Sequence, residues 1–229
     1  IGFSSTVQGD NSVAIGSNNT VTGTNSILIG NNNTLSINNE AYIGNSVTAS
    51  IGGAVNWTAT SDGRFKEDIQ ENVPGLDFIN ALRPVTYHFD VTKMHSFQAN
   101  GSLGRLQEGA KQKSEVQYSG FIAQEVERAA QILGYDFSGV KIPLDPEKQA
   151  YGLRYAEFVV PLTKAVQELN QKVEDQEAII ARQDQSMSQY QETLERYEAL
   201  MMQMENRMQA LEAKVEQSSQ NTTLSGGKK

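Results

Sequence analysis

Hydrophobic and polar residues alternate with a fixed period at the start of the chain. The pair Ile-Gly occurs four times at intervals of 14 residues, beginning at Ile1, Ile15, Ile29 and Ile43. Alternating apolar and polar positions are typical of β-strands, and the Asn- and Gly-rich spacers are typical of turns. Each unit of residues 1–55 is predicted to form a strand, a turn, a second strand and a turn. One unit cannot bury its own apolar face, so the units should stack into a β-solenoid. A disordered linker is the alternative, and four units in phase argue against it.

Residues 56–156 lack this period and predict a small α+β domain. Trp57 is expected to pack at its junction with the repeat. The pattern predicts two helical pieces between 69 and 82, broken at Pro74-Gly75, then a strand at 85–89 and a long hairpin or partly mobile loop at 90–117. A strand at 118–122, a helix at 123–133 and a strand at 151–155 follow. The inner side of that helix is predicted to hold Val126, Ala129, Ala130 and Leu133.

Residues 157–217 are predicted to form a coiled coil. Apolar and polar seam positions alternate in steps of four and three without a slip, which requires partner helices. The seam comprises Leu162, Val166, Leu169, Val173, Gln176, Ile180, Gln183, Met187, Tyr190, Leu194, Tyr197, Met201, Met204, Met208, Leu211 and Val215. The two Gln layers fix the register and suit three strands at least as well as two. Residues 218–229 are expected to be disordered.

Composition narrows the functional classes. The 229 residues carry a formal net charge of −8, which argues against a sequence-independent grip on nucleic acid. The chain has no Cys and only two His, His88 and His95, so neither a thiolate nor a histidine metal site is expected, and no cofactor site is recognised. No apolar run is long enough to span a membrane. The chain begins inside a repeat, which predicts a C-terminal part of a longer protein without its targeting segment.

The sharpest change in composition falls at Thr60-Ser61-Asp62-Gly63-Arg64-Phe65-Lys66. No Lys or Arg precedes this stretch, whereas charged residues are frequent after it. It places a hydroxyl nucleophile, Ser61, five residues before an amine, Lys66. Five residues on an α-helix set two side chains about 140° apart, so the chain must turn at Asp62-Gly63 or Lys66 must reach Ser61 of a neighbouring copy. The alternative is a Ser-Asp-Gly turn that caps a helix, with Lys66 exposed.

Two resemblances give these patterns a function. Residues 1–50 resemble the left-handed β-roll head repeats of trimeric autotransporter adhesins. Residues 58–175 resemble the self-cleaving C-terminal intramolecular chaperones of the endosialidase type, a Ser–Lys peptidase family. The second resemblance rests on four blocks in order, at 61–66, 82–87, 120–126 and 155–162. The polar insert between Val91 and Gln117, and Phe65 where Leu is common, depart from that family.

The second resemblance implies a single-turnover serine endopeptidase. Ser61 would be the nucleophile, Lys66 its base, Thr60–Ser61 the cleaved bond, and Arg64 a supporting positive charge. A lysine can act as a base only when burial or nearby charge lowers its pKa towards neutrality. Structural roles are expected for His88 and for Glu125 at a helix start.

Together with these patterns, the two resemblances imply a homotrimeric fibre end on a bacterial surface or a phage particle. Its middle domain would help the fibre to fold and then release itself. A structural fibre terminus that trimerises without cutting is the alternative. A membrane-tethered transcription factor with the same module is a third reading, and the β-roll and the lack of a basic domain argue against it.

Overall fold

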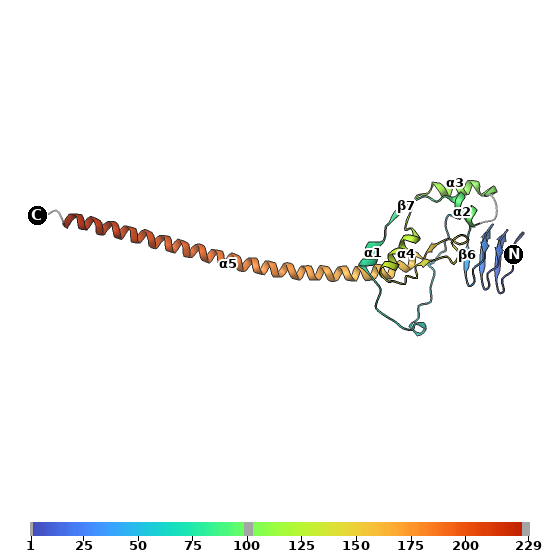
Figure 1. The fold of residues 1–229 in the computed structure, drawn as a ribbon, viewed down its shortest axis with the longest axis horizontal. Helices are drawn as coiled ribbons and strands as arrows, with labels where there is room; N and C mark the ends of the chain where they lie inside the picture. Colours follow the sequence, from blue (N-terminus) through green and yellow to red (C-terminus); the bar gives the residue numbers. More distant parts are fainter. Residues whose placement is uncertain (1, 99–102, 226–229) are drawn as a thin grey trace. The chain divides into compact units, whose positions relative to one another are not determined.

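The protein is described by a computed structural model that covers residues 2–98 and 103–225, with side chains described as far as residue 217. The chain divides into two compact units, residues 1–166 and 167–229. The first unit contains the N-terminal repeat and the α+β region, and the second is part of one long helix (Figure 1).

The N-terminal repeat forms two parallel three-stranded sheets, with strand orders β1-β3-β5 and β2-β4-β6. Each strand pairs with the strand 14 residues further along, as Thr6 does with Thr20 and Ile27 with Ala41. The register confirms the period read from the sequence. The strands are β1 (Thr6–Val7), β2 (Val13–Ser17), β3 (Thr20–Val21), β4 (Ile27–Asn31), β5 (Thr34–Leu35) and β6 (Ala41–Ile43).

The corners between these strands recur every seven residues. At each corner a residue other than glycine adopts the left-handed conformation, with φ between 53° and 59°. Asn tolerates this conformation better than most residues, which explains why it fills five of the six corners. The corner residues are Ser4, Asn11, Asn18, Asn25, Asn32 and Asn39. Each 14-residue unit is therefore built from two similar halves.

The interior of the repeat holds one apolar residue from each half: Ala14, Val21, Leu28 and Leu35. Polar side chains are buried beside them. The amide of Asn19 donates to the Gly30 carbonyl at 2.9 Å, and that of Asn33 donates to the Gly44 carbonyl at 2.7 Å. These bonds join neighbouring units and satisfy polar groups that would be costly to bury unpaired.

The alternating Ile and Val residues of the sequence pattern lie on the outside of the repeat. Val13, Ile15, Ile27, Ile29 and Ile43 stand on the β2-β4-β6 sheet with 36–45% of their surface exposed. The residues between them point inward. We call these five residues the outer apolar face.

The α+β region packs around a core of aromatic and small residues. The rings of Phe78 and Phe158 each meet the ring of Phe137 with centroids 4.9 Å apart. Two small antiparallel sheets, β7-β8 and β10-β9, accompany the core. The elements are α1 (Leu76–Ala81), β7 (Val85–Tyr87), α2 (Val91–Gln98), α3 (Gln107–Glu115), β8 (Tyr118–Gly120), α4 (Ala123–Ile132), β9 (Val140–Lys141) and β10 (Gly152–Leu153), with 3-10 turns η1 (Gly63–Phe65), η2 (Gly104–Leu106) and η3 (Tyr155–Phe158).

Several expectations for this region are wrong. Residues 69–74 form no helix, since Pro74 ends the pattern and nothing covers Ile69. The polar insert is a pair of helices, α2 and α3, which bury Val91, His95 and Ala110; its residues 99–102 lie outside the described residues. Trp57 is 85% exposed and packs against no junction, and Leu133 faces solvent.

The last helix, α5 (Val159–Ser225), has 67 residues. Pro161 and Ala165 are buried in its first turns. Every described side chain from 169 to 217 is exposed, the whole seam from Leu169 included. The helix continues past residue 217 into the tail that was expected to be disordered, and residues 226–229 lie outside the described residues.

Candidate functional site

The candidate site lies in an extended connection between β6 and α1. From residue 49 to residue 72 every side chain is exposed except that of Asp62. The only regular element in this stretch is the short turn η1. An exposed segment with so little regular structure is of the kind in which proteolytic nicking concentrates.

Asp62 organises the turn at this site. Its carboxylate accepts a hydrogen bond from the Arg64 backbone N–H at 2.9 Å and so caps η1. The Phe65 N–H donates to the Asp62 carbonyl and the Lys66 N–H to the Gly63 carbonyl. The chain therefore reverses within these residues, as the helical spacing argument required for a contact within one chain.

The reversal brings the two predicted functional side chains together. Lys66 Nζ donates to Ser61 Oγ at 2.9 Å. Both features considered from the sequence are present, because the Asp62 cap coexists with a Ser61–Lys66 contact. An ammonium group has donors only. Lys66 could therefore accept the Ser61 proton only after losing one of its own, which exclusion of water favours.

Arg64 is occupied by Asp62. Its Nε and Nη2 atoms both bond the carboxylate, with an Nη2–Oδ2 distance of 2.6 Å. These bonds hold the pKa of Asp62 below its usual value and raise that of Arg64. The guanidinium charge is thus largely compensated by Asp62, and the supporting role of Arg64 towards Lys66 stays a prediction.

The other sequence blocks meet in the α+β core. Block 82–87 and block 120–126 are joined by β7-β8 pairing, with Val85 opposite Gly120. The 155–162 block reaches them through Tyr155, whose hydroxyl accepts a bond from the Phe121 N–H at 3.2 Å. Arg83 forms a two-pronged ion pair with Glu125, which confirms a structural use of Glu125. His88 is exposed.

Sequence reasoning missed a second set of polar residues, which links the repeat to the inserted helices. Ser46 Oγ and His95 Nδ1 lie 2.8 Å apart and both residues are buried. Lys113 Nζ donates to the carbonyls of Ser46 and Thr48. The partners are 49 to 67 residues apart in the chain, and no local pattern marks such a contact.

Metal-binding clusters and membrane-spanning helices are both absent from the described part of the chain. Among residues 2–98 and 103–225, no cluster of three His, Asp or Glu side chains could hold a metal ion. The helices in those ranges include none that is long and apolar enough to cross a membrane.

Two protein families match the parts of the chain that carry the two resemblances. Residues 61–135 match the family described as "Chaperone of endosialidase". This region is similar to the endosialidase-type chaperones. The match begins at Ser61 and ends before the 155–162 block. Residues 1–19 and 8–33 match two copies of the YadA head domain repeat. Both resemblances are therefore confirmed, and the first family implies a chaperone role. No curated protein and no solved structure matches the chain.

Proposed function

We propose that this chain is the end of a homotrimeric surface fibre, whose middle domain helps the fibre to fold and then cuts itself free between Thr60 and Ser61. The observation that carries the proposal is the 2.9 Å contact between Lys66 Nζ and Ser61 Oγ. It lies in an exposed connection, at the first residue of the region of chaperone type. A hydroxyl nucleophile beside an amine is the minimum that a Ser–Lys peptidase requires.

The chemistry proceeds in two steps. Ser61 Oγ attacks the Thr60 carbonyl carbon as Lys66 Nζ takes the hydroxyl proton. The Thr60–Ser61 C–N bond then breaks, its nitrogen receives a proton, and an ester joins Thr60 to Ser61 Oγ. Water hydrolyses this ester, leaving a carboxylate on Thr60 and a free amine and hydroxyl on Ser61. Each chain reacts once.

Assembly would switch on this reaction. In a single chain Ser61 and Lys66 are exposed, and water keeps an amine protonated. Neighbouring chains that cover the connection would remove that water and favour the neutral amine. Cleavage would then follow folding, so that the chaperone leaves only after its task is complete.

Two surfaces support the trimer. The outer apolar face presents five Ile and Val side chains, and the α5 seam is exposed from Leu169 onwards. Apolar surface of this extent and regularity marks a protein–protein contact. We propose that the outer apolar faces of three β-roll solenoids meet in the shaft and that three α5 helices form a coiled coil. In this scheme the parts are the shaft at 1–55, the chaperone at 56–156, the coiled coil at 157–217 and a tail at 218–229.

The physical reason for a removable chaperone is kinetic. A slender trimeric shaft depends on contacts between different chains, so it assembles slowly and its intermediates are prone to aggregation. A coiled coil gathers three chains and sets their register. Removing it afterwards leaves the shaft without a route back, so the fibre is trapped in its assembled state.

The proposal is tested by the dependence of cleavage on Lys66 and on assembly. Lys66→Ala should block the cut, and Lys66→Arg should not restore it because a guanidinium stays protonated. Disrupting the α5 seam should slow the cut as well. Fragment masses on a denaturing gel report each result. Normal cleavage of Lys66→Ala would rule out Lys66 as the base.

A trimeric fibre terminus that does not cut is the second candidate. It is favoured by the Asp62 cap and by the exposure of Lys66, both of which suit an ordinary surface turn. A wild-type chain that stays intact after it has assembled would support this candidate.

A further inference from the structure

The repeat and the domain that would leave it are held together by more than the peptide chain. Four contacts each join a residue before Thr60 to one after Ser61. Cutting the Thr60–Ser61 bond would leave these contacts in place. They form what we call the retention interface: Glu40, Ser46 and Thr48 on the repeat side, and His95, Lys113 and Lys141 on the other.

The first part of this interface is a buried polar contact at the end of the repeat. Ser46 and His95 are 2% and 3% exposed, and their Oγ and Nδ1 atoms lie 2.8 Å apart. Next to them Lys113 Nζ donates to the Ser46 carbonyl at 2.9 Å and to the Thr48 carbonyl at 3.0 Å. Burial lowers the pKa of Lys113. The Ser46 and Thr48 carbonyls accept these hydrogen bonds only while α3, which carries Lys113, stays bound to the repeat.

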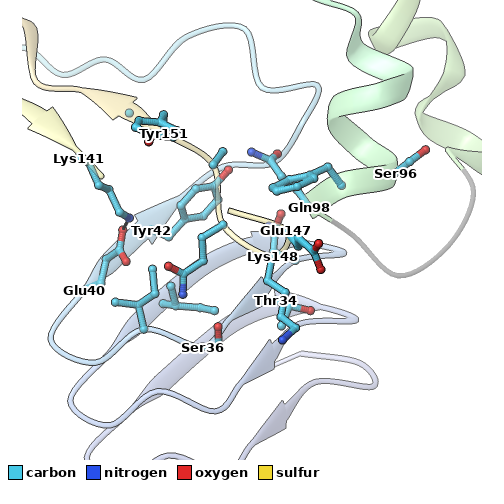
Figure 2. A pocket seen from close by; sticks show the side chains of 17 residues that line it. Thr34, Ser36, Glu40, Tyr42, Ser96, Gln98, Lys141, Glu147, Lys148 and Tyr151 are labelled. Carbon is cyan, nitrogen blue, oxygen red and sulfur yellow. Dashed lines mark hydrogen bonds and ion pairs between the residues drawn. The ribbon is translucent and has the colours of Figure 1, made fainter. Parts of the chain in front are cut away.

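The second part is an ion pair beside an incompletely filled space. Lys141 on β9 pairs with Glu40, just before β6 (Figure 2). The adjoining cavity of about 570 Å³ is lined by Glu40 and Tyr42 from the repeat and by Tyr151 and Lys141 from the α+β region. The interface thus combines polar contacts with an open space that both polar and apolar residues line.

We infer that the two cleavage products stay bound through the retention interface, and that this interface, not the cut, sets the rate at which the repeat is released. The inference rests on the proposed function. Before the cut, the connection holds the two sides at an effective concentration in the millimolar range, so even a weak interface stays closed. After the cut, the same interface must hold at the actual concentration of the fragments. An interface that leaves a cavity unfilled can then open on dilution.

The test separates release from self-cleavage. In a full chain carrying Ser61→Ala, residues 52–57 of the exposed connection are replaced by the recognition sequence of a site-specific protease. External cleavage then cuts the connection whether or not the chain can cut itself. Separation of the fragments is followed by size-exclusion chromatography after dilution.

The fragments should co-elute at first and separate slowly, and 1 M salt should speed the separation because the Lys contacts are partly exposed. Lys113→Ala should speed it by about tenfold, since it removes two charge-assisted hydrogen bonds. Lys111→Ala is the matched control, since it removes the same charge from an exposed position of the same helix. If Lys113→Ala fails to fold, as judged by thermal melting, Ser46→Ala tests the same interface from the repeat side.

Immediate separation of the parent fragments would overturn the inference, as would equal rates for Lys113→Ala and Lys111→Ala. A wild-type chain that never cuts itself would instead contradict the proposed function, and it would leave the result on the retention interface standing.

Discussion

The repeat and the long helix both carry regularly spaced apolar residues, but they differ in how much of that surface one chain can bury. In the repeat, Val21 and Leu28 are fully buried, and hydrogen bonds from Asn19 and Asn33 tie successive units together. In α5, every described seam residue from Leu169 onwards is exposed. The repeat therefore buries a core within one chain, whereas this part of the helix buries none of its described side chains there.

This difference suggests a division of labour. A helix that depends entirely on partners is suited to gathering chains, and it has no further use once they are joined. In the proposed fibre, a repeat with its own core would persist after the helix had been released. The exposed connection that holds Ser61 separates these two kinds of structure in the sequence.

The largest effect is expected from charges placed in the seam. Ile180→Asp combined with Leu194→Asp would bury like charges against each other in an assembled coil, and should lower trimer association by more than about a thousandfold. Ala178→Asp combined with Ala199→Asp puts the same charges on the opposite side of the helix and should leave the trimer intact. Light scattering gives the mass of the assembly. Equal masses for the two double variants would contradict the proposal that the seam joins the three helices.

The next effect distinguishes the inner and outer faces of one strand. Leu28 is fully buried and Ile29 is 36% exposed. Leu28→Ala should cost about 2–5 kcal/mol of unfolding free energy in monomer and trimer alike. Ile29→Ala should cost clearly less in a chain kept monomeric by the seam charges, and should approach the Leu28 value in the trimer. Denaturant unfolding measures both. If Ile29→Ala lowered the unfolding free energy equally in monomer and trimer, the outer apolar face would not be an interface.

A smaller effect is expected where two sequence blocks touch. A Cβ at Gly120 would stand 2.3 Å from the Tyr155 hydroxyl oxygen. The Tyr155 ring is stacked near Phe121 and Phe158, so it cannot move freely. Gly120→Ala should therefore destabilise the domain by about 1–3 kcal/mol. Adding Tyr155→Phe removes the clashing atom and should recover part of the loss. Gly52→Ala, with nothing nearby, should change little.

The smallest effect concerns the exposed pair of Arg83 and Glu125. The Arg83 side chain holds the pKa of Glu125 below its usual 4.5. The pair therefore stabilises the domain above that pH, and the contribution is lost as the pH falls through the lowered value. Glu125→Gln should slightly lower the melting temperature at pH 7 and should have no effect in strong acid. A difference that persists in acid would contradict an electrostatic origin.

The sequence was sufficient where periodicity was strong. The 14-residue register, the long helix and three of the four predicted inner residues of α4 (Val126, Ala129 and Ala130, but not Leu133) followed from spacing. The alternation was misleading in the strands of the repeat, because both faces of these strands carry apolar residues. Val13 and Ile15 lie on the outside, whereas Ala14 is buried inside. The inserted helices were missed because they are polar, and His95 and Lys113 face residues far away in the chain.

At the candidate site the spacing of Ser61 and Lys66 predicted either a turn or a contact with a neighbouring copy, and the turn capped by Asp62 is the one present in the chain. The pairing of Arg64 with Asp62 was not foreseen, although the opposite charges of these two side chains favour it. Covering of the site by other copies cannot be read from one chain, because it depends on contacts between chains.

The central claim is that Ser61 cuts the chain before itself, and intact-mass spectrometry of the purified protein tests it most directly. The wild-type chain should give two fragments of 60 and 169 residues, the larger beginning at Ser61. Ser61→Ala should give one intact chain that still trimerises, while Ser50→Ala, an exposed serine of the same connection, should be cut normally. A Ser61→Ala chain still cut after Thr60 would contradict the account, because another nucleophile or protease would then be responsible.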